Sequence, residues 1–168
     1  MIEMKVAGIA LEAVTRSPIV LLKDYEDRRA LPIYIGQDQA KAIISALERQ
    51  NPPRPMTHDL MVNMLEAWDL TLDRIIIHSL QSDTFYAVLC VRQGEVLKEF
   101  DARPSDAIAI AVRTGCPIWV MEEVIADASI PVDRDADEQE RRAFREFLSG
   151  VRPEDFIKRS SFPTGESQ

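Results

Sequence analysis

Three strand-like runs with very short connections constrain the fold of this chain more than any other feature. The runs cover residues 72–80, 84–92 and 95–100, and each is rich in apolar or β-branched residues. Three residues separate the first two runs, and Gln93-Gly94 separates the second from the third. Connections this short join antiparallel neighbours, so the sequence predicts two consecutive β-hairpins.

The residues before these hairpins predict a second group of strands. Residues 1–14 carry apolar side chains on both alternating sets, and further strand-like runs cover residues 19–23 and 31–35. We expect these three runs to form an antiparallel meander. Helical patterns then follow over residues 40–47 and 57–68. Strands in two groups with helices between them are typical of an α+β fold, here a single domain with a mixed, largely antiparallel sheet and helices packed on it.

The second of these helical patterns has Thr57 as its expected N-cap. It carries an apolar stripe that we expect to contact the core or a second subunit. The stripe consists of Leu60, Met61, Met64, Leu65 and Trp68.

The predicted domain covers residues 1–132. We expect a peripheral charged helix at residues 133–150 and a C-terminal extension at residues 151–168, whose end we expect to be disordered.

Charge and composition limit the location and partners of the protein. The sequence has 168 residues and a net charge of -8, which argues against broad electrostatic capture of nucleic acid. No apolar run reaches the roughly 20 residues that a membrane-spanning helix needs. The amino terminus lacks the features of a signal peptide, and the two cysteines, Cys90 and Cys116, lie in apolar runs typical of buried free thiols. We therefore expect a cytoplasmic protein with no membrane partner.

Residues 100–115 carry the most distinctive chemistry. A strand is expected to end near Asp101, Pro104 is expected at the first position of a helix, and Gly115 is expected to end that helix. Asp106 would lie in the first turn. A helix start has free N–H groups and the positive end of the dipole, so this position suits an anion such as a phosphate.

Three motifs in this order resemble the bifunctional nuclease domain family. They are LPIYIG with the helix after it (31–47), RPMTHDL (54–60) and DARPSDAIAIAVR (101–113), and the resemblance spans most of residues 1–132. It implies DNase and RNase activity with low sequence specificity, a mixed α+β fold and a homo-oligomer, with a dimer as the first expectation. One position departs from the family pattern, because this chain has Gln39 where an acidic residue is common.

Phosphodiester hydrolysis requires stabilisation of negative charge, activation of water and help for the leaving oxygen. A divalent ion, Mg²⁺ or Mn²⁺, held by carboxylates can supply all three. The candidates are Asp59, Asp101 and Asp106 as metal ligands and catalytic groups, His58 as an acid or base, and Arg54, Arg103 and Ser105 as substrate-binding groups. Nucleic acid binding should be weak and salt-sensitive, because the net charge is negative.

Each carboxylate also has a structural explanation. Asp59 and Asp106 could complement a helix dipole, and Asp101 could simply end a strand. A second hypothesis therefore stays open, in which the chain is a non-catalytic homo-oligomeric module that binds a phosphate-bearing ligand or a protein partner.

Overall fold

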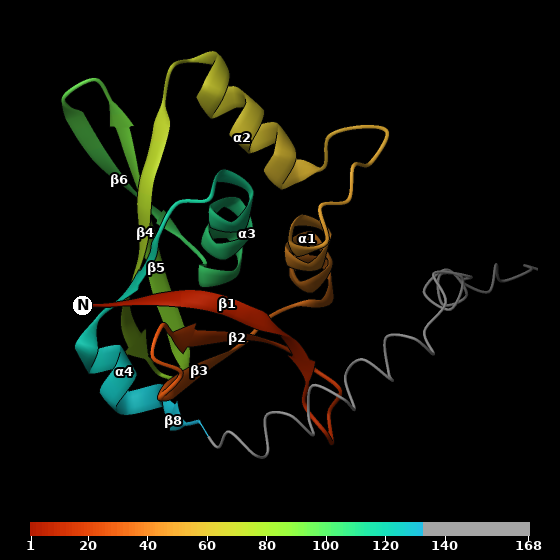
Figure 1. Cartoon of the computed structure of the whole chain (residues 1–168), viewed down its shortest axis with the longest axis vertical. Helices are drawn as coiled ribbons and strands as arrows, with labels where there is room; N and C mark the ends of the chain where they lie inside the picture. Colours follow the sequence, from red (N-terminus) through yellow and green to blue (C-terminus); the bar gives the residue numbers. More distant parts are fainter. Residues whose placement is uncertain (133–168) are drawn as a thin grey trace, which may run out of the picture. The chain divides into compact units, whose positions relative to one another are not determined.

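A mixed sheet of eight strands organises residues 1–132, which are the residues that the computed structural model describes (Figure 1). The strand order is β6-β5-β4-β7-β1-β2-β3-β8. The strands are β1 (Ile2–Leu11), β2 (Pro18–Asp24), β3 (Arg29–Tyr34), β4 (Thr71–Gln81), β5 (Thr84–Gln93), β6 (Val96–Ala102), β7 (Ile118–Val120) and β8 (Ile130–Pro131).

Both predicted strand groups are confirmed. β1, β2 and β3 form an antiparallel meander, and β4, β5 and β6 form two antiparallel hairpins. The short strand β7 joins the groups. Its Ile118 lies opposite Ile75 of β4 in a parallel pair and opposite Met4 of β1 in an antiparallel pair. This single parallel pair makes the sheet mixed, and the α+β fold class predicted from the sequence is correct.

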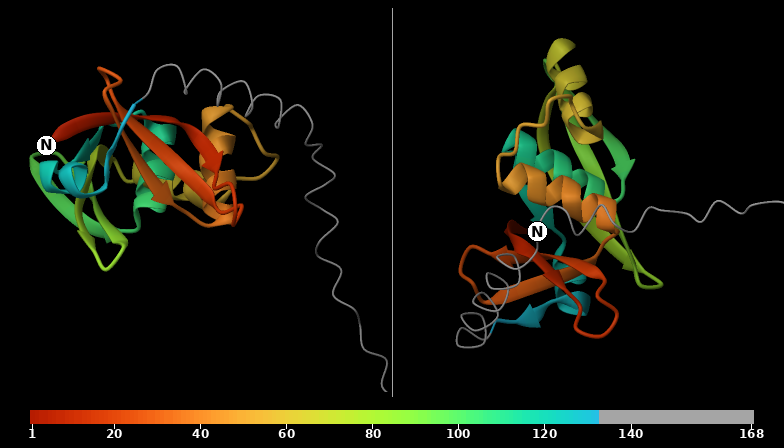
Figure 2. Two further views of the ribbon diagram at one scale, coloured as in Figure 1. Left: turned by 90° about the horizontal axis from the view of Figure 1, so that it is seen from below. Right: turned by 90° about the vertical axis from the view of Figure 1, so that its right-hand side faces the viewer.

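Four helices accompany the sheet, and three of them position the residues of interest. They are α1 (Gln37–Leu47), α2 (Thr57–Ala67), α3 (Pro104–Thr114) and α4 (Glu122–Ala128). Helices α1 and α3 lie side by side, with α2 beyond them (Figures 1 and 2). The middle helix, α3, is almost wholly enclosed, because the five residues from Ala107 to Ala111 are each at most 2% exposed.

The ends of α3 follow the expected chemistry. Arg103 is the N-cap residue and Pro104 occupies the first turn, where its missing N–H leaves no hydrogen bond unmade. At the other end, Gly115 has a φ of 72° in the left-handed region, and its N–H donates to the carbonyl of Ala111. A rigid helix with defined ends therefore fixes the position of Asp106.

The start of helix α2 differs from the expectation, and its apolar stripe contacts the core only in part. Thr57 is the first residue of α2 rather than its cap, and Met56 is the N-cap residue. The apolar stripe of α2 is mostly not in the core, because α2 has no buried residue and Trp68, just after it, is 72% exposed. Only Val62 and Leu65 of this helix pack against the core.

Strand β8 had no sequence signal, because Ile130 and Pro131 pair with only two residues at the start of β3. The helix predicted at residues 133–150 and the extension at residues 151–168 lie outside the described residues. Within residues 1–132, no helix is both long and apolar enough to span a bilayer.

Candidate functional site

The first turns of α2 and α3 meet through a histidine and an aspartate. His58 follows Thr57 at the start of α2, and Asp106 lies in the first turn of α3. Nε2 of His58 lies 3.1 Å from Oδ1 of Asp106, although 48 residues separate them in the chain. The side chain of His58 is 12% exposed and that of Asp106 is 26% exposed. The structure thus brings the RPMTHDL and DARPSD segments together at one point.

Arg103 engages the other oxygen of the same carboxylate. Its Nε donates to Oδ2 of Asp106 at 2.6 Å. Burial alone would raise the pKa of Asp106, but the hydrogen bonds with Arg103 and His58 outweigh it and lower the pKa below its usual value. The Asp106 hydrogen bond also raises the pKa of Arg103. Asp106 is therefore an ionised acceptor that can orient an imidazole.

The side chain of Arg103 remains 67% exposed despite this contact. Its two Nη atoms make no hydrogen bond or ion pair with any other residue among residues 1–132. A guanidinium with free Nη groups can bind a phosphate through two parallel hydrogen bonds.

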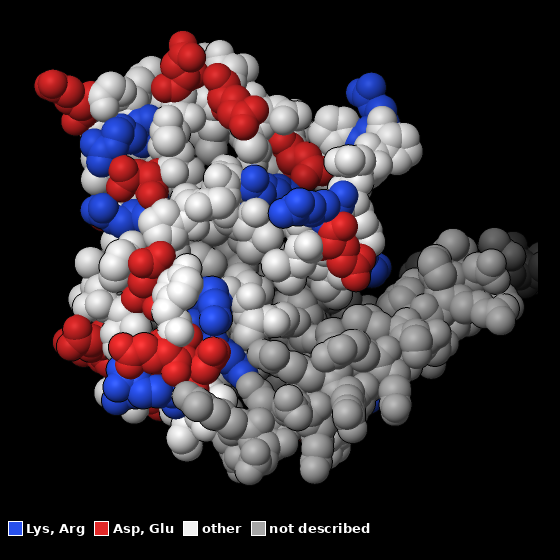
Figure 3. Space-filling model, viewed as in Figure 1, with Lys and Arg blue, Asp and Glu red and all other residues white. Residues whose placement is uncertain are grey.

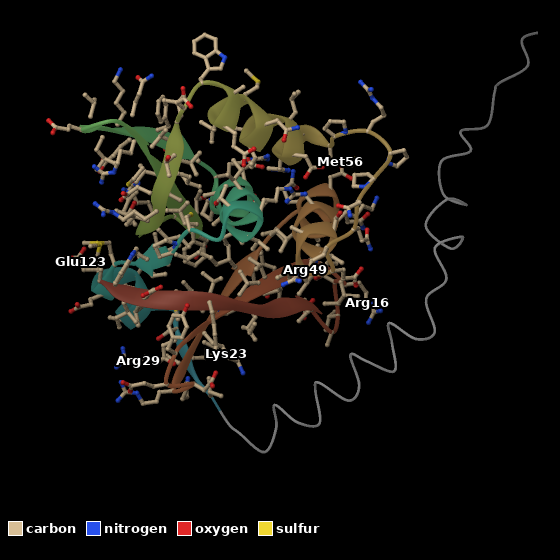
Figure 4. The ribbon with its side chains drawn as sticks, turned by 45° about the horizontal axis from the view of Figure 1, so that its top comes forward. Arg16, Lys23, Arg29, Arg49, Met56 and Glu123 are labelled. Atoms are coloured by element: carbon tan, nitrogen blue, oxygen red, sulfur yellow. The ribbon has the colours of Figure 1, made fainter. Side chains whose placement is uncertain are left out.

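Asp59 makes a separate pair with Arg113 of the last turn of α3. Nε of Arg113 donates to Oδ1 at 2.6 Å, and this hydrogen bond is the main reason that the pKa of Asp59 is lowered. Oδ2 of Asp59 accepts the N–H of Met56 at 2.9 Å. Figure 4 places Met56 at the start of α2, beside α1. Asp59 thus stabilises the helix start, which is the structural role considered for it from the sequence.

A pocket of about 420 Å³ opens beside Arg103. The N-terminal ends of two helices contribute to its wall, through Gly36 and Gln39 at the start of α1 and through Arg103 and Ser105 at the start of α3. Ser105 is only 8% exposed. Arg103 therefore belongs to both features, since it contacts Asp106 and also lines this pocket.

The remaining predicted residues lie outside these contacts. Asp101 lies in β6 opposite Val88 and is exposed, and Arg54 is exposed in the loop before α2. Among residues 1–132, neither side chain makes a hydrogen bond or ion pair with His58 or Asp106. Both residues remain sequence-based candidates.

The carboxylates provide a test of the predicted metal site. Both oxygens of Asp59 and both oxygens of Asp106 already have partners. Within the described part of the chain, no three His, Cys, Asp or Glu residues form a group that could hold a metal ion. The three aspartates therefore do not form a preassembled metal site in this conformation, and metal dependence stays a prediction.

Arg113 is the residue that the sequence analysis missed. Its Nη1 donates to the carbonyl oxygens of Ala42 in α1 and Ala109 in α3, at 3.0 and 2.8 Å, while Nε binds Asp59 in α2. One side chain thus connects three helices. The sequence signal was an arginine at the end of an otherwise apolar helix, which is equally typical of a residue that complements the C-terminal dipole.

Charged side chains of both signs alternate on the face shown in Figure 3, without one broad basic area. This distribution agrees with the net charge of -8. With a net charge of -8, attraction for a polyanion depends on local groups such as Arg103.

Comparison of the sequence with models of known protein families shows to which family the chain belongs. The model of the bifunctional nuclease domain matches residues 20–133. The chain belongs to the bifunctional nuclease domain family. The match includes both helix starts that meet at His58 and Asp106, so the family resemblance inferred from the three motifs is confirmed.

Relatives of this bifunctional nuclease domain protein fall into two groups. An uncharacterised protein of Mycobacterium tuberculosis (strain ATCC 25618 / H37Rv) is 42% identical over 164 residues, which cover 92% of this chain and 97% of the relative. Bifunctional nuclease 1 of Oryza sativa subsp. japonica is 26% identical over 117 residues, which cover 68% of this chain and 35% of the relative. The chain therefore corresponds to about a third of the rice protein.

Proposed function

We propose that this protein hydrolyses phosphodiester bonds of DNA and RNA with low sequence specificity, at a site formed by His58, Asp106 and Arg103. The observation that carries the proposal is the 3.1 Å approach of His58 Nε2 to Asp106 Oδ1 where two helices begin. Membership of the bifunctional nuclease domain family and the name of the rice relative support this reaction class.

The three side chains have complementary roles in this proposal. With its proton on Nε2, His58 donates to the Asp106 carboxylate, so Nδ1 keeps a lone pair that can accept a proton from an attacking water. Asp106 fixes the ring and stabilises the imidazolium that forms. The water oxygen bonds to phosphorus, and the bond to the leaving oxygen breaks as that oxygen takes up a proton from solvent. Arg103 binds the phosphate oxygens and stabilises the negative charge that develops on them.

A divalent ion, Mg²⁺ or Mn²⁺, remains part of the proposal as a separate prediction. It would supply further charge stabilisation and an activated water. Because Asp59 and Asp106 are each bound by an arginine, their participation as ligands would require these pairs to rearrange.

Substrate binding is expected to be weak and to fall steeply with salt. The net charge of -8 opposes the approach of a polyanion, and the proposed site offers one exposed arginine, Arg103. Low affinity of this kind also agrees with low sequence specificity, because phosphate contacts carry no base information.

The decisive experiment measures cleavage of fluorescent single-stranded and double-stranded DNA and RNA by the full chain. Reactions contain Mg²⁺, Mn²⁺ or EDTA. We expect His58→Gln and Asp106→Asn each to lower the rate at least about 100-fold, the usual contribution of general acid–base catalysis. His78→Gln is the matched control, because His78 is the other histidine of the sequence and is exposed on β4.

Equal activity of His58→Gln and the wild type would refute the proposed site. Absence of cleavage under every metal condition would refute the proposed function and favour the alternative, a non-catalytic module that binds a phosphate-bearing ligand or a protein partner.

We also propose that the protein forms a homo-oligomer, with a dimer as the first expectation, and acts in the cytoplasm. Support for the oligomer comes from the apolar face of α2, where Leu60, Met64 and Trp68 are 52%, 57% and 72% exposed. Apolar surface that the core does not cover is typical of contact sites between subunits.

A further inference from the structure

The pocket beside Arg103 has features that the proposed hydrolytic site does not use. It lies between the starts of α1 and α3, the end of β3 and the turn between β4 and β5. Its volume of about 420 Å³ is in the usual range for small-molecule sites.

Ser105 provides the first indication of a ligand. It lines the pocket although it is only 8% exposed. Among residues 1–132 its hydroxyl has no hydrogen-bond partner. Solvent reaches this hydroxyl, because within residues 1–132 the only buried side-chain polar atom without a partner is Nε of Arg74. The hydroxyl is therefore free to donate to a ligand in the pocket. A bound oxyanion would accept its proton.

The two helix starts add further donors at the same place. Neither α1 nor α3 has a side-chain cap, so N–H groups in the first turn of α1 lack intrahelical acceptors. In α3 the N–H of Ser105 is the one left, because Pro104 has no N–H and the N–H of Asp106 donates to the carbonyl of Arg103. Both positive dipole ends contribute to one pocket. Together with the free Nη groups of Arg103, they favour a group with negative charge and several acceptor oxygens, which is the chemistry of a phosphate.

Two aromatic side chains also line the pocket. Tyr34, the last residue of β3, is 63% exposed, and Phe85 of β5 is partly buried. Both line the pocket. Exposed aromatic rings next to a phosphate-binding group are typical of sites that stack a nucleobase. Asp83 also lines the pocket, and its carboxylate disfavours a second phosphate there.

We infer that this pocket binds one unpaired nucleotide of a single strand, with its phosphate at Ser105 and the helix starts and its base against Tyr34. This inference rests on the proposed function and extends it to a substrate preference. A paired base in a duplex would have to leave the stack to enter the pocket, so single strands bind better than duplexes.

The test measures binding without hydrolysis. Adenosine 5′-monophosphate, adenosine and inorganic phosphate are titrated into the full chain in EDTA at low salt and followed by NMR or calorimetry. We expect the monophosphate to bind at least about tenfold more tightly than either adenosine or inorganic phosphate, because only it makes both the phosphate and the stacking contacts.

Two variants test the two parts of the pocket. Ser105→Ala should weaken binding of the monophosphate about tenfold, because it removes a hydrogen bond to a charged group. Tyr34→Ala should weaken it at least about fivefold by removing the stacking surface. Tyr25→Ala is the matched control, because Tyr25 is 62% exposed, almost as much as Tyr34, and does not line the pocket.

Two results would overturn the inference. One is that binding of the monophosphate cannot be detected, and the other is that its affinity is unchanged in both Ser105→Ala and Tyr34→Ala. Equal competition by single-stranded and double-stranded oligonucleotides would also overturn it. The two proposals can fail separately. If the wild type binds the nucleotide but hydrolyses no substrate, the nuclease activity is refuted and the pocket is retained. If the wild type hydrolyses the substrate, His58→Gln does not, and neither binds the nucleotide, only the pocket is refuted.

Discussion

Nε of Arg113 lies 2.6 Å from Oδ1 of Asp59, so the last turn of α3 holds the first turn of α2. The same guanidinium also binds a carbonyl of α1, the helix that contributes Gln39 to the pocket. The chemistry proposed for His58 and Asp106 therefore depends on a residue that contacts neither of them.

Replacement of Arg113 by Ala should lower the free energy of unfolding by about 2–4 kcal/mol, because it leaves a carboxylate and two carbonyls without their donor. The side chain of Arg113 is only 9% exposed. Urea denaturation measures the change. Arg103→Ala is the matched control, because the side chain of Arg103 is 67% exposed and its ion pair with Asp106 should contribute less than about 1 kcal/mol. Equal losses in the two variants would contradict the structural role of Arg113.

The Asp59–Arg113 pair should also make stability depend on pH. The pKa of Asp59 is lowered in the folded state from a reference value of 3.8, so its contribution is present at neutral pH. It should begin to disappear as the pH falls below about 3.8, the unfolded value, and be lost as the pH passes through the folded pKa. The difference in stability between the wild type and Asp59→Asn should therefore shrink in acid. If the difference in the free energy of unfolding between the two proteins stays constant down to the acid transition, the Asp59–Arg113 pair is not its cause.

Replacement of Gly115 by Ala should destabilise the protein by about 1 kcal/mol, because its φ of 72° lies in the left-handed region. Gly115→Asn should cost less, because asparagine tolerates this conformation better. Thermal or urea denaturation of the two variants gives the comparison. An alanine variant as stable as the wild type would mean that the helix end adjusts freely.

The exposed face of α2 allows a test of the proposed oligomer. Changing Met64 and Trp68 together to Glu should convert the oligomer to monomers, because two carboxylates would be buried in the contact. Both side chains are more than half exposed, so the fold of the monomer should be retained. Light scattering after size-exclusion chromatography measures the mass. Val14→Glu, at a turn residue that is 86% exposed, is the control. A wild-type protein that is monomeric at all concentrations would refute the oligomer.

The fold was predictable where local chemistry decides it. Short connections predicted the hairpins, and Pro104 and Gly115 predicted both ends of α3. The burial of α2 was not predictable from the sequence. An apolar stripe has the same sequence pattern whether it packs against the core of its own chain or against a second subunit. Strand β8 was missed because two residues carry too little periodicity to indicate a strand.

The candidate site was predictable only as a set of residue types. Charges at two helix starts directed attention to His58 and Asp106, and the structure places them in contact. Sequence spacing could not tell which aspartate would meet the histidine, because the packing of α2 against α3 decides it. For the same reason Asp101 was grouped with Asp106, although Asp101 is an exposed residue of β6.

The position of β7 has a consequence for synthesis of the protein. This strand of three residues is the only one that pairs with both strand groups within residues 1–132, and it pairs with the first residues of β1. The two groups can each form earlier from local contacts, but they cannot become one sheet before the chain has been made to Val120. Joining across so long a stretch of chain is slow compared with hairpin formation. The growing polypeptide therefore passes through a stage in which two half-sheets exist with open inner edges.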